Sequence, residues 1–285
     1  MSVLLPPLPR LLVEPIVRAA LLEDLGRAGD ITTDAVVPAD ARFRAAIVSR
    51  QDGVVAGTDA AVIAFALVDP ALEVKVVRGD GTRVAPGDMV LALDGPARAV
   101  LTGERVALNL ACRLSGIATA TAALVAAARP HGHAQIVCTR KTTPGLRALE
   151  KHAVRAGGGG NHRFGLDDAV LIKDNHIAVA GGVATAIARA KAHAGHMVKI
   201  EVEVDTLDQL AEALEAGVDA VLLDNMSPET LARAVAMVGG RALTEASGRM
   251  SPANVGAVAA SGVDLISVGW ITHSAPILDL GLDAA

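Results

Sequence analysis

The second half of the chain alternates short apolar runs with segments of helical spacing. The apolar runs cover residues 135–138, 169–173, 198–204, 219–224, 241–246 and 264–268, and the helical segments cover 145–155, 181–194, 206–216, 227–238 and 251–260. Strands that alternate with helices in this way pair in parallel, so the pattern predicts a βα barrel or a doubly wound sheet. Six strands are too few for a complete eight-stranded barrel.

The first half has no such rhythm. Strand-like runs cover residues 43–48, 53–57, 73–77 and 89–93, and helical spacing covers 11–25 and 58–67. This mixture predicts an α+β domain, in which Asp30–Asp34 forms an ordered turn with cap-forming side chains. Residues 97–128 are strongly helical, and we expect two helices there, broken near Ser115–Gly116.

The segment from Cys138 to His176 differs in charge from the rest of the chain. It holds seven Lys/Arg and four acidic residues, a formal charge of +3, whereas the whole chain carries −5. A basic pocket on an acidic protein favours a small anionic ligand, because nucleic acid would need a broad basic face. Aromatic residues make up only 1% of the chain, which disfavours base-stacking platforms for single strands. We therefore expect no nucleic-acid partner.

Composition also bears on the cellular compartment in which we expect the protein. The two cysteines, Cys112 and Cys138, provide no disulfide framework or zinc cluster, which is typical of a reducing cytoplasm. Met1–Arg10 lacks the basic start of a signal peptide, and no uncharged apolar run reaches membrane-spanning length. We therefore expect a cytoplasmic protein without a membrane partner.

Several charged residues follow or end the expected strands, where a βα barrel places its active site. Arg140 and Lys141 follow the first strand, and Lys173 ends the second. Glu203 and Asp224 end the next two strands and could share a Mg²⁺ ion, although Asp224 could instead cap the following helix. Glu201 lies on the same side of its strand as Glu203, and is either buried against the basic segment or part of the site.

Other candidates leave alternatives open. Thr244–Gly248 and Val268–Gly269 follow late strands, where glycine-rich loops commonly hold a phosphate, but glycines after strands are also ordinary turns. Lys173 is either a Schiff-base lysine or an ion-pairing group for a ligand anion. His162 stands in a glycine-flanked loop, which favours a ligand contact. Gly157–Gly160 follows no strand, so we predict a flexible connection rather than a dinucleotide-binding turn.

Several motifs in the same order carry a family resemblance. They are Thr139-Arg140-Lys141-Thr142, Gly157 to Arg163, Leu171 to His176, Glu201 to Val204 and Leu222 to Asn225, with Glu23 to Gly26, Gly103 to Arg105 and Thr272 to Ser274 extending the likeness to both ends. The chain resembles the quinolinate phosphoribosyltransferases. Two positions depart from the family pattern: Cys138 stands where aspartate is frequent, and Arg249 where a second glycine is frequent.

The resemblance implies an N-terminal α+β open sandwich and an incomplete, seven-stranded α/β barrel. We assign residues 1–115 to the first domain and 116–270 to the barrel, with the tail, 271–285, packing back on the first domain. The resemblance also implies a homodimer with shared active sites, in which Arg105 acts in the partner's site. Assembly beyond the dimer is left open.

The implied reaction joins quinolinate to phosphoribosyl pyrophosphate and yields nicotinate mononucleotide, pyrophosphate and CO₂, with Mg²⁺ as the cofactor, in NAD biosynthesis. The implied quinolinate set is Arg105, Thr139, Arg140, His162, Arg163 and Lys173. The implied set for phosphoribosyl pyrophosphate is Lys141, Asn175, Ser247, Gly248, Gly269 and His273. Lys141, Glu203 and Asp224 are the expected catalytic residues, and the last two are the expected metal ligands.

Two other functions remain open from the sequence. One is a Schiff-base barrel aldolase that uses Lys173. The other is a relative of the same fold that is associated with molybdenum transport.

Overall fold

A computed structural model describes residues 5–285; Met1–Leu4, the start of the segment considered as a signal peptide, lies outside the described residues. The chain forms two compact units. The first contains the residues up to Ala122 together with Thr142–Gly158 and Ile271–Ala285. The second contains Ala123–Lys141 and Gly159–Trp270. Each unit therefore combines segments that are distant in the sequence.

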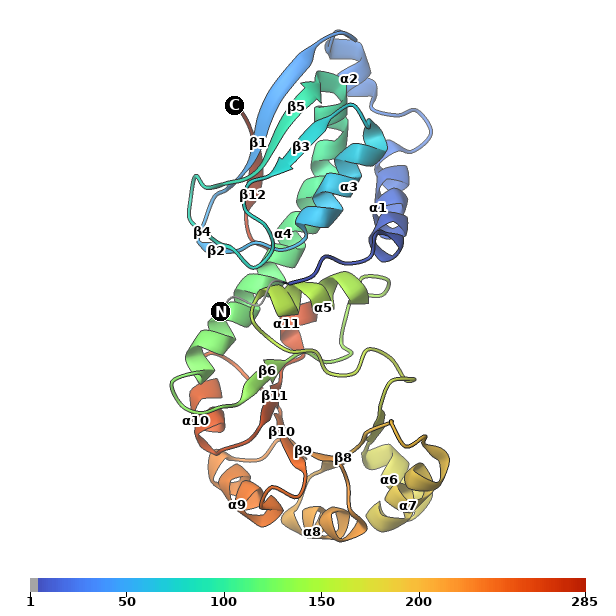
Figure 1. Cartoon of the computed structure of the whole chain (residues 1–285), viewed down its shortest axis with the longest axis vertical. Helices are drawn as coiled ribbons and strands as arrows, with labels where there is room; N and C mark the ends of the chain where they lie inside the picture. Colours follow the sequence, from blue (N-terminus) through green and yellow to red (C-terminus); the bar gives the residue numbers. More distant parts are fainter. Residues whose placement is uncertain (1–4) are drawn as a thin grey trace. The chain divides into compact units, whose positions relative to one another are not determined.

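The first unit is built on an antiparallel sheet with the order β12-β1-β5-β3 (Figure 1). Its strands are β1 (Arg42–Ser49), β3 (Glu73–Val76), β5 (Met89–Pro96) and β12 (Leu280–Ala284). The C-terminal strand β12 pairs with β1, so the end of the chain completes this sheet. A separate two-stranded ladder joins β2 (Gly53–Val54) to β4 (Arg83–Val84).

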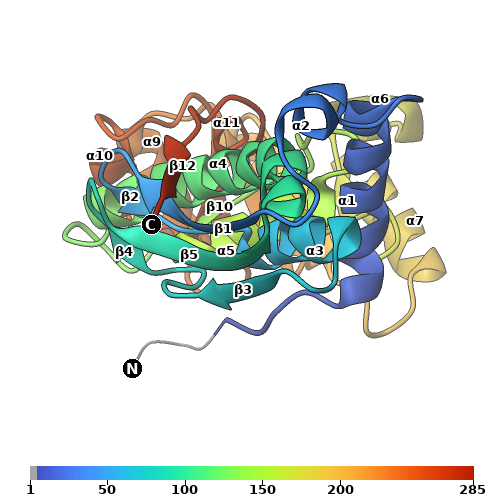
Figure 2. The ribbon, with the colours of Figure 1, turned by 90° about the horizontal axis from the view of Figure 1, so that it is seen from above.

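Three helices accompany this sheet. They are α1 (Arg10–Leu25), α2 (Ile31–Val36) and α3 (Thr58–Val68), and α1 lies beside α3 (Figure 2). The turn expected over Asp30–Asp34 is wrong, because Ile31–Val36 forms helix α2. The cap-forming role is confirmed at Asp30, whose carboxylate accepts a hydrogen bond from the Thr33 N–H at 2.9 Å. The α+β character predicted for this half is confirmed.

Helix α4 (Ala97–Ala128) corrects one expectation, because it is one unbroken helix and not two. Ser115 does not interrupt it: its hydroxyl accepts from the Ala56 N–H at 3.0 Å and donates to the Ala56 carbonyl at 3.1 Å. Gly116 lies against the chain at Pro276, whose carbonyl oxygen would stand 2.1 Å from an added Cβ. The glycine therefore permits close packing of two backbones rather than ending the helix. The helix is long and apolar enough to cross a membrane, but 56% of the relevant window is buried in the protein, as in a core helix.

A buried ion pair links α4 to α5 (Arg147–Ala156) in the first unit. Glu150 is fully buried, and its Oε1 accepts from Arg113 Nε at 3.0 Å and from Nη2 at 2.5 Å. Its Oε2 accepts from the Thr143 N–H at 3.0 Å. The same Arg113 Nη2 donates to the Thr143 hydroxyl and, at 3.0 Å, to the Thr272 carbonyl. One acid and one cation thus fix three segments of this unit.

The second unit is built on a parallel sheet with the order β6-β11-β10-β9-β8-β7. The strands are β6 (Gln135–Val137), β7 (Val170–Ile172), β8 (Ile200–Val204), β9 (Ala220–Asp224), β10 (Leu243–Ser247) and β11 (Leu265–Ser267). Helices α7 (Val183–His193), α8 (Leu207–Ala216), α9 (Pro228–Val238) and α10 (Val255–Ala260) lie outside the curved sheet (Figure 1). The six predicted strands and this barrel architecture are confirmed, while the short helix α6 (Asp174–Ala180) was not predicted.

Gly160 marks the place of the expected seventh strand. It forms a parallel bridge with Val137, in which the Gly160 N–H donates to the Ile136 carbonyl at 2.7 Å. Within residues 5–285, the ladders end at Gly160 on one side and at β7 on the other, so the barrel is incomplete. The prediction of a flexible connection at Gly157–Gly160 is therefore wrong at its last residue, which is bound to the sheet.

Candidate active site

The second unit contains a cavity of about 510 Å³ at the carboxyl ends of its strands. Its lining residues are Thr139, Arg140, Lys141, His162, Arg163, Leu171, Lys173, Glu203, Leu222, Asp224, Glu245, Ser247 and Ser267. The period of two along a strand explains which residues face it. In β8, Val202 and Val204 are fully buried on the other face, which leaves Glu203 to the cavity.

Four cations line this cavity, namely Arg140, Lys141, Arg163 and Lys173. The Nε atoms of Arg140 and Arg163 are buried and have no hydrogen-bond partner. Burial and then the nearby Arg140 guanidinium lower the pKa of Arg163, because both disfavour its positive charge. Buried donors normally have partners, so these guanidinium groups are arranged for an anion that the chain does not itself supply.

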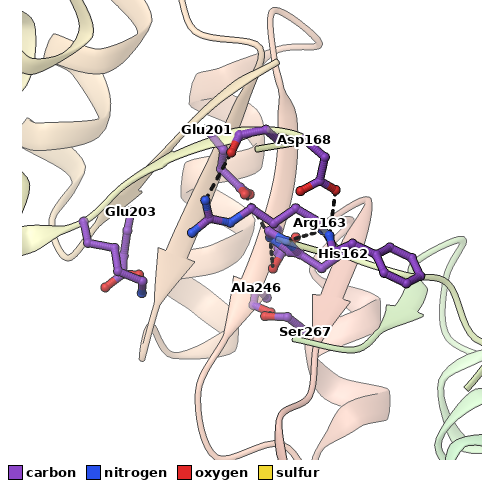
Figure 3. A network of polar contacts seen from close by, with 11 residues as sticks. His162, Arg163, Asp168, Glu201, Glu203, Ala246 and Ser267 are labelled. Carbon is purple, nitrogen blue, oxygen red and sulfur yellow. Dashed lines mark hydrogen bonds and ion pairs between the residues drawn. The ribbon is translucent and has the colours of Figure 1, made fainter. Parts of the chain in front are cut away.

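A tight loop holds Arg163 (Figure 3). The Asp168 carboxylate accepts from the backbone N–H groups of Phe164 and Gly165 at 2.6 and 2.9 Å. Arg163 Nη1 donates to the Ala169 carbonyl at 3.1 Å. The guanidinium group is therefore anchored at one end, and its Nε remains without a partner.

His162 lines the cavity and is held from both sides of its ring. Nδ1 accepts from the Arg163 N–H at 2.7 Å, so the ring proton is assigned to Nε2. Nε2 faces Glu201 Oε2 at 3.0 Å (Figure 3). The same Nε2 lies 3.7 Å from Glu245 Oε1. Of the two possibilities for Glu201, the structure favours burial against the basic segment, since Glu201 is 8% exposed and pairs with His162 rather than lining the cavity.

Glu245 is a site residue that the sequence analysis did not single out. It is 1% exposed, it lines the cavity from β10, and its Oε1 has no hydrogen-bond partner. Burial, and then the nearby Glu201 carboxylate, raise the pKa of Glu245 to about 7. The available signal was its position two residues before Ser247, on the same face of the strand.

Glu203 and Asp224 end neighbouring parallel strands and line the same cavity. The Lys173 ammonium group forms an ion pair with the Glu203 carboxylate. Asp224 Oδ2 accepts from the Asn225 side-chain amide at 2.6 Å. Asp224 does not cap α9, because that cap is Ser227, whose hydroxyl accepts from the Thr230 N–H. That alternative for Asp224 is therefore wrong.

The donor set at Glu203 and Asp224 fits a hard cation such as Mg²⁺. The two carboxylates supply oxygen ligands. Glu203 already pairs with one positive charge, the Lys173 ammonium group. Among the described residues, three ligand atoms come together elsewhere, on His162, Glu201 and Glu245. We regard that cluster as less suited to a metal, because both ring nitrogens of His162 are engaged: Nδ1 accepts from the Arg163 N–H and Nε2 donates to Glu201. Mg²⁺ commonly takes one or two carboxylates and completes its shell with water and phosphate oxygens.

Some expected site residues do not line this cavity. They are Arg105, Asn175, Gly248, Gly269 and His273. Arg105 lies on α4 in the first unit, where its side chain is 63% exposed and its Nη2 is 3.8 Å from Glu104 Oε1. His273 is exposed and its Nδ1 lies 2.6 Å from the Ser274 hydroxyl.

Family models match nearly the whole chain. The N-terminal domain of quinolinate phosphoribosyl transferase matches residues 30–115, and the C-terminal domain matches residues 117–283. A nicotinate-nucleotide pyrophosphorylase (carboxylating) from Mycobacterium leprae is 46% identical over 275 residues, which cover 94% of this chain and 95% of the relative. A probable enzyme of the same name from Bacillus subtilis is 44% identical over 262 residues, covering 92% and 90%.

Solved structures agree. The nicotinate-nucleotide pyrophosphorylase from Francisella tularensis is 38% identical, with a TM-score of 0.94 and complete coverage of both chains. With these relatives and the two family models, the chain belongs to the quinolinate phosphoribosyl transferase family.

Proposed function

We propose that the cavity of the second unit binds quinolinate and phosphoribosyl pyrophosphate and converts them to nicotinate mononucleotide, pyrophosphate and CO₂. The observation that carries this proposal is the pair of buried, unpartnered guanidinium nitrogens on Arg140 and Arg163. Quinolinate has two adjacent carboxylates, and arginine binds carboxylates with paired hydrogen bonds. A dianion of this kind supplies the partners that these groups lack.

The lining residues divide between the two proposed substrates. Arg140, Arg163 and Lys173 would bind the quinolinate carboxylates, with Thr139 and His162 beside them. Lys141 would neutralise negative charge on the departing pyrophosphate. Ser247 would bind the 5′-phosphate with Gly248, and we keep Asn175, Gly269 and His273 as proposed contacts for the same substrate.

The proposed chemistry needs no covalent bond to the protein. The pyridine nitrogen attacks the ribose C1 as the C1–O bond to pyrophosphate breaks. The fixed cations orient quinolinate for this attack and leave its ring nitrogen unpaired. When bound at Glu203 and Asp224, Mg²⁺ would supply further charge neutralisation at the pyrophosphate. The quaternised ring nitrogen then stabilises the electron pair that remains on the adjacent carbon when CO₂ leaves.

The alternatives are not favoured. A Schiff-base lysine must be neutral to attack a carbonyl group, whereas Lys173 is paired with the carboxylate of Glu203. The relatives described above are named for the carboxylating pyrophosphorylase, not for molybdenum transport.

The test of the function is an assay of the purified chain with quinolinate, phosphoribosyl pyrophosphate and Mg²⁺. We expect nicotinate mononucleotide, pyrophosphate and CO₂ in equal amounts. The same mixture without Mg²⁺ is the control, and we expect much slower turnover in it. Absence of a nucleotide product under both conditions would contradict the proposal.

We further propose a homodimer in which Arg105 completes the partner subunit's site, in a cytoplasmic setting. The support is the exposed guanidinium of Arg105, whose nearest acid is at 3.8 Å, together with its place in the family motif. The Arg105→Ala and Lys141→Ala homodimers should each be nearly inactive. In a mixed dimer, one active site carries both substitutions and the other carries neither. Subunit exchange should therefore restore part of the activity. Exchange without recovery would assign Arg105 to its own subunit or to structure.

A further inference from the structure

Glu245 is an acid in a cavity built for anions. The cavity is lined by Arg140, Lys141, Arg163 and Lys173, yet Glu245 is almost fully buried within it. A negative charge on Glu245, in addition to those of Glu203 and Asp224, would repel a dianionic substrate. A buried carboxyl group is tolerated in such a place if it carries a proton.

The partners of Glu245 leave one oxygen available. Its Oε1 has no hydrogen-bond partner, and the Ser267 hydroxyl donates to the Ala246 carbonyl at 3.5 Å. The only proton near Oε1 within the described His162–Glu201–Glu245 cluster is on His162 Nε2. That nitrogen lies 3.7 Å from Oε1, and it already donates a hydrogen bond to Glu201 Oε2 at 3.0 Å. One ring proton cannot satisfy both carboxylates.

The geometry of the cluster is consistent with a proton shared at Glu245. Its ligand atoms lie within 4.8 Å of one another, which brings two carboxyl groups close together in a buried place. Two carboxyl groups this near each other do not both ionise readily, so one of them retains a proton. Burial raises the pKa of Glu245 to about 7, which agrees with this arrangement.

We propose that Glu245 is the acid that protonates the pyridine carbon from which CO₂ leaves. This inference rests on the proposed function. The bond between ring carbon 2 and its carboxylate breaks, CO₂ departs, and the electron pair stays on carbon 2 beside the positively charged ring nitrogen. That pair forms a C–H bond with the Glu245 proton, and Glu245 becomes a carboxylate. A proton from solvent restores the acid after the product leaves, so no oxidant or reductant is required.

An acid in this position would affect the second chemical step and not the first. Pyrophosphate leaves when the pyridine nitrogen attacks the ribose, which needs no proton from Glu245. Without a nearby donor, the newly formed carbanion would recombine with CO₂ before water protonated it. The dicarboxylated nucleotide would then accumulate.

The decisive experiment is a single turnover with quinolinate labelled in the 2-carboxyl group, in which pyrophosphate and CO₂ are measured separately. The wild-type enzyme should release both together. Glu245→Gln keeps the shape and removes the acid, and should release pyrophosphate at a rate near that of the wild type. Its CO₂ release should be slower by roughly 100-fold or more, the range of a positioned general acid. Glu245→Asp, which keeps an acid at a shorter reach, should recover part of the CO₂ rate.

Glu215→Gln is the matched control, because it makes the same chemical change at an exposed position on α8. It should leave both rates unchanged. Equal and simultaneous release of pyrophosphate and CO₂ by Glu245→Gln would overturn the proposal. An equal loss of both would also overturn it, since it would show a role in the first step or in folding. If the wild-type enzyme released no pyrophosphate, the proposed function itself would fail.

A second measurement uses the unmodified enzyme and does not depend on the folding of a variant. The rate of CO₂ release should fall as the pH rises above about 7, while the rate of pyrophosphate release does not follow the same curve. The titratable groups that influence Glu245 are Glu201, His162 and Lys173, with the Arg140 and Arg163 guanidinium groups on the same cavity. The fall in CO₂ release should be absent in Glu245→Gln. A CO₂ rate that is independent of pH up to 9 in the wild type would overturn the proposal.

Discussion

Glu150 in the first unit and Glu245 in the second are buried to the same extent, 0% and 1% exposed, but they differ in their partners. Both Glu150 oxygens accept hydrogen bonds, from Arg113 and from the Thr143 N–H. The Oε1 of Glu245 has no hydrogen-bond partner, and within residues 5–285 no arginine pairs with this carboxyl group. A buried acid that serves the fold is neutralised by the chain itself. A buried acid left unsatisfied points to chemistry that involves something else.

The arginines repeat this contrast. Arg113 donates to a carboxylate, a hydroxyl and a carbonyl in its own unit. Arg140 and Arg163 each retain a buried Nε without a partner. In the described part of the chain, the three buried side-chain atoms without partners all belong to residues that line one cavity. Incomplete hydrogen bonding therefore locates the site independently of any family motif.

The largest expected effect is the loss of stability on breaking the Arg113–Glu150 ion pair, whose hydrogen bonds are complete. Arg113→Ala leaves the Glu150 charge buried without its cation, and should lower the free energy of unfolding by about 3 kcal/mol. We choose the lower end of the usual range because the Arg113 side chain is 30% exposed. Urea unfolding measures this change. In a Glu150→Gln background, Arg113→Ala should lower the free energy of unfolding much less, because no buried charge is left without a partner. A loss of only about 1 kcal/mol, as for an exposed ion pair, would contradict the view that Glu150 is a buried charge neutralised by Arg113.

The next effect concerns the unsatisfied arginines. Nicotinate has one carboxylate where quinolinate has two, so it would leave part of the Arg140–Arg163 pair without a partner. Each lost charge-assisted hydrogen bond is worth about 1.5–3 kcal/mol, or roughly 10-fold or more in kcat/KM. Competition between the two acids measures the ratio. Arg163→Met should lower this ratio, because it lowers kcat/KM for quinolinate more than kcat/KM for nicotinate. Equal use of both acids by the wild type would contradict this view of the cavity.

The smallest effect concerns Lys173 and Glu203. Their ion pair is partly exposed, with side chains 46% and 14% accessible, so it should contribute only about 0.2–1 kcal/mol. In Lys173→Met, the freed Glu203 should bind Mn²⁺, used as a probe for Mg²⁺, about two- to fivefold more tightly. Electron paramagnetic resonance measures free Mn²⁺ without turnover. Asp224→Asn should weaken the same binding. Unchanged Mn²⁺ affinity in both variants would place the metal elsewhere.

Much of the architecture could be predicted from apolar periodicity. The six barrel strands follow runs such as Val221–Leu223, whose burial leaves a strong sequence signal. The break expected in α4 failed because Gly116 suggested an end, while its actual role depends on contact with Pro276, far away in the sequence. The seventh barrel segment was not placed because Gly160 contributes a single bridge rather than an apolar run.

The site was only partly predictable for a related reason. Charged residues after strands, such as Arg140 and Lys173, are visible in sequence because their positions are polar and exposed to a ligand. Glu245 was not visible, since its significance lies in the missing partner of one oxygen, which only tertiary packing reveals. The Lys173–Glu203 pair likewise joins two residues that the sequence suggested for different ligands.

The claim that Glu245 holds a proton at neutral pH can be tested by unfolding the wild type and Glu245→Gln across a range of pH. The pKa of Glu245 is raised from 4.5 to about 7, so the folded state binds this proton more tightly than the unfolded state. The stability contributed by that proton is complete below about pH 4.5 and is lost as the pH rises through about 7. Glutamine has no such proton, and the titration of groups that do not interact with Glu245 cancels in the comparison. The stability of Glu245→Gln relative to wild type should therefore increase by about 3 kcal/mol over this range. A difference that does not change with pH would show that Glu245 is an ordinary carboxylate and would contradict the account.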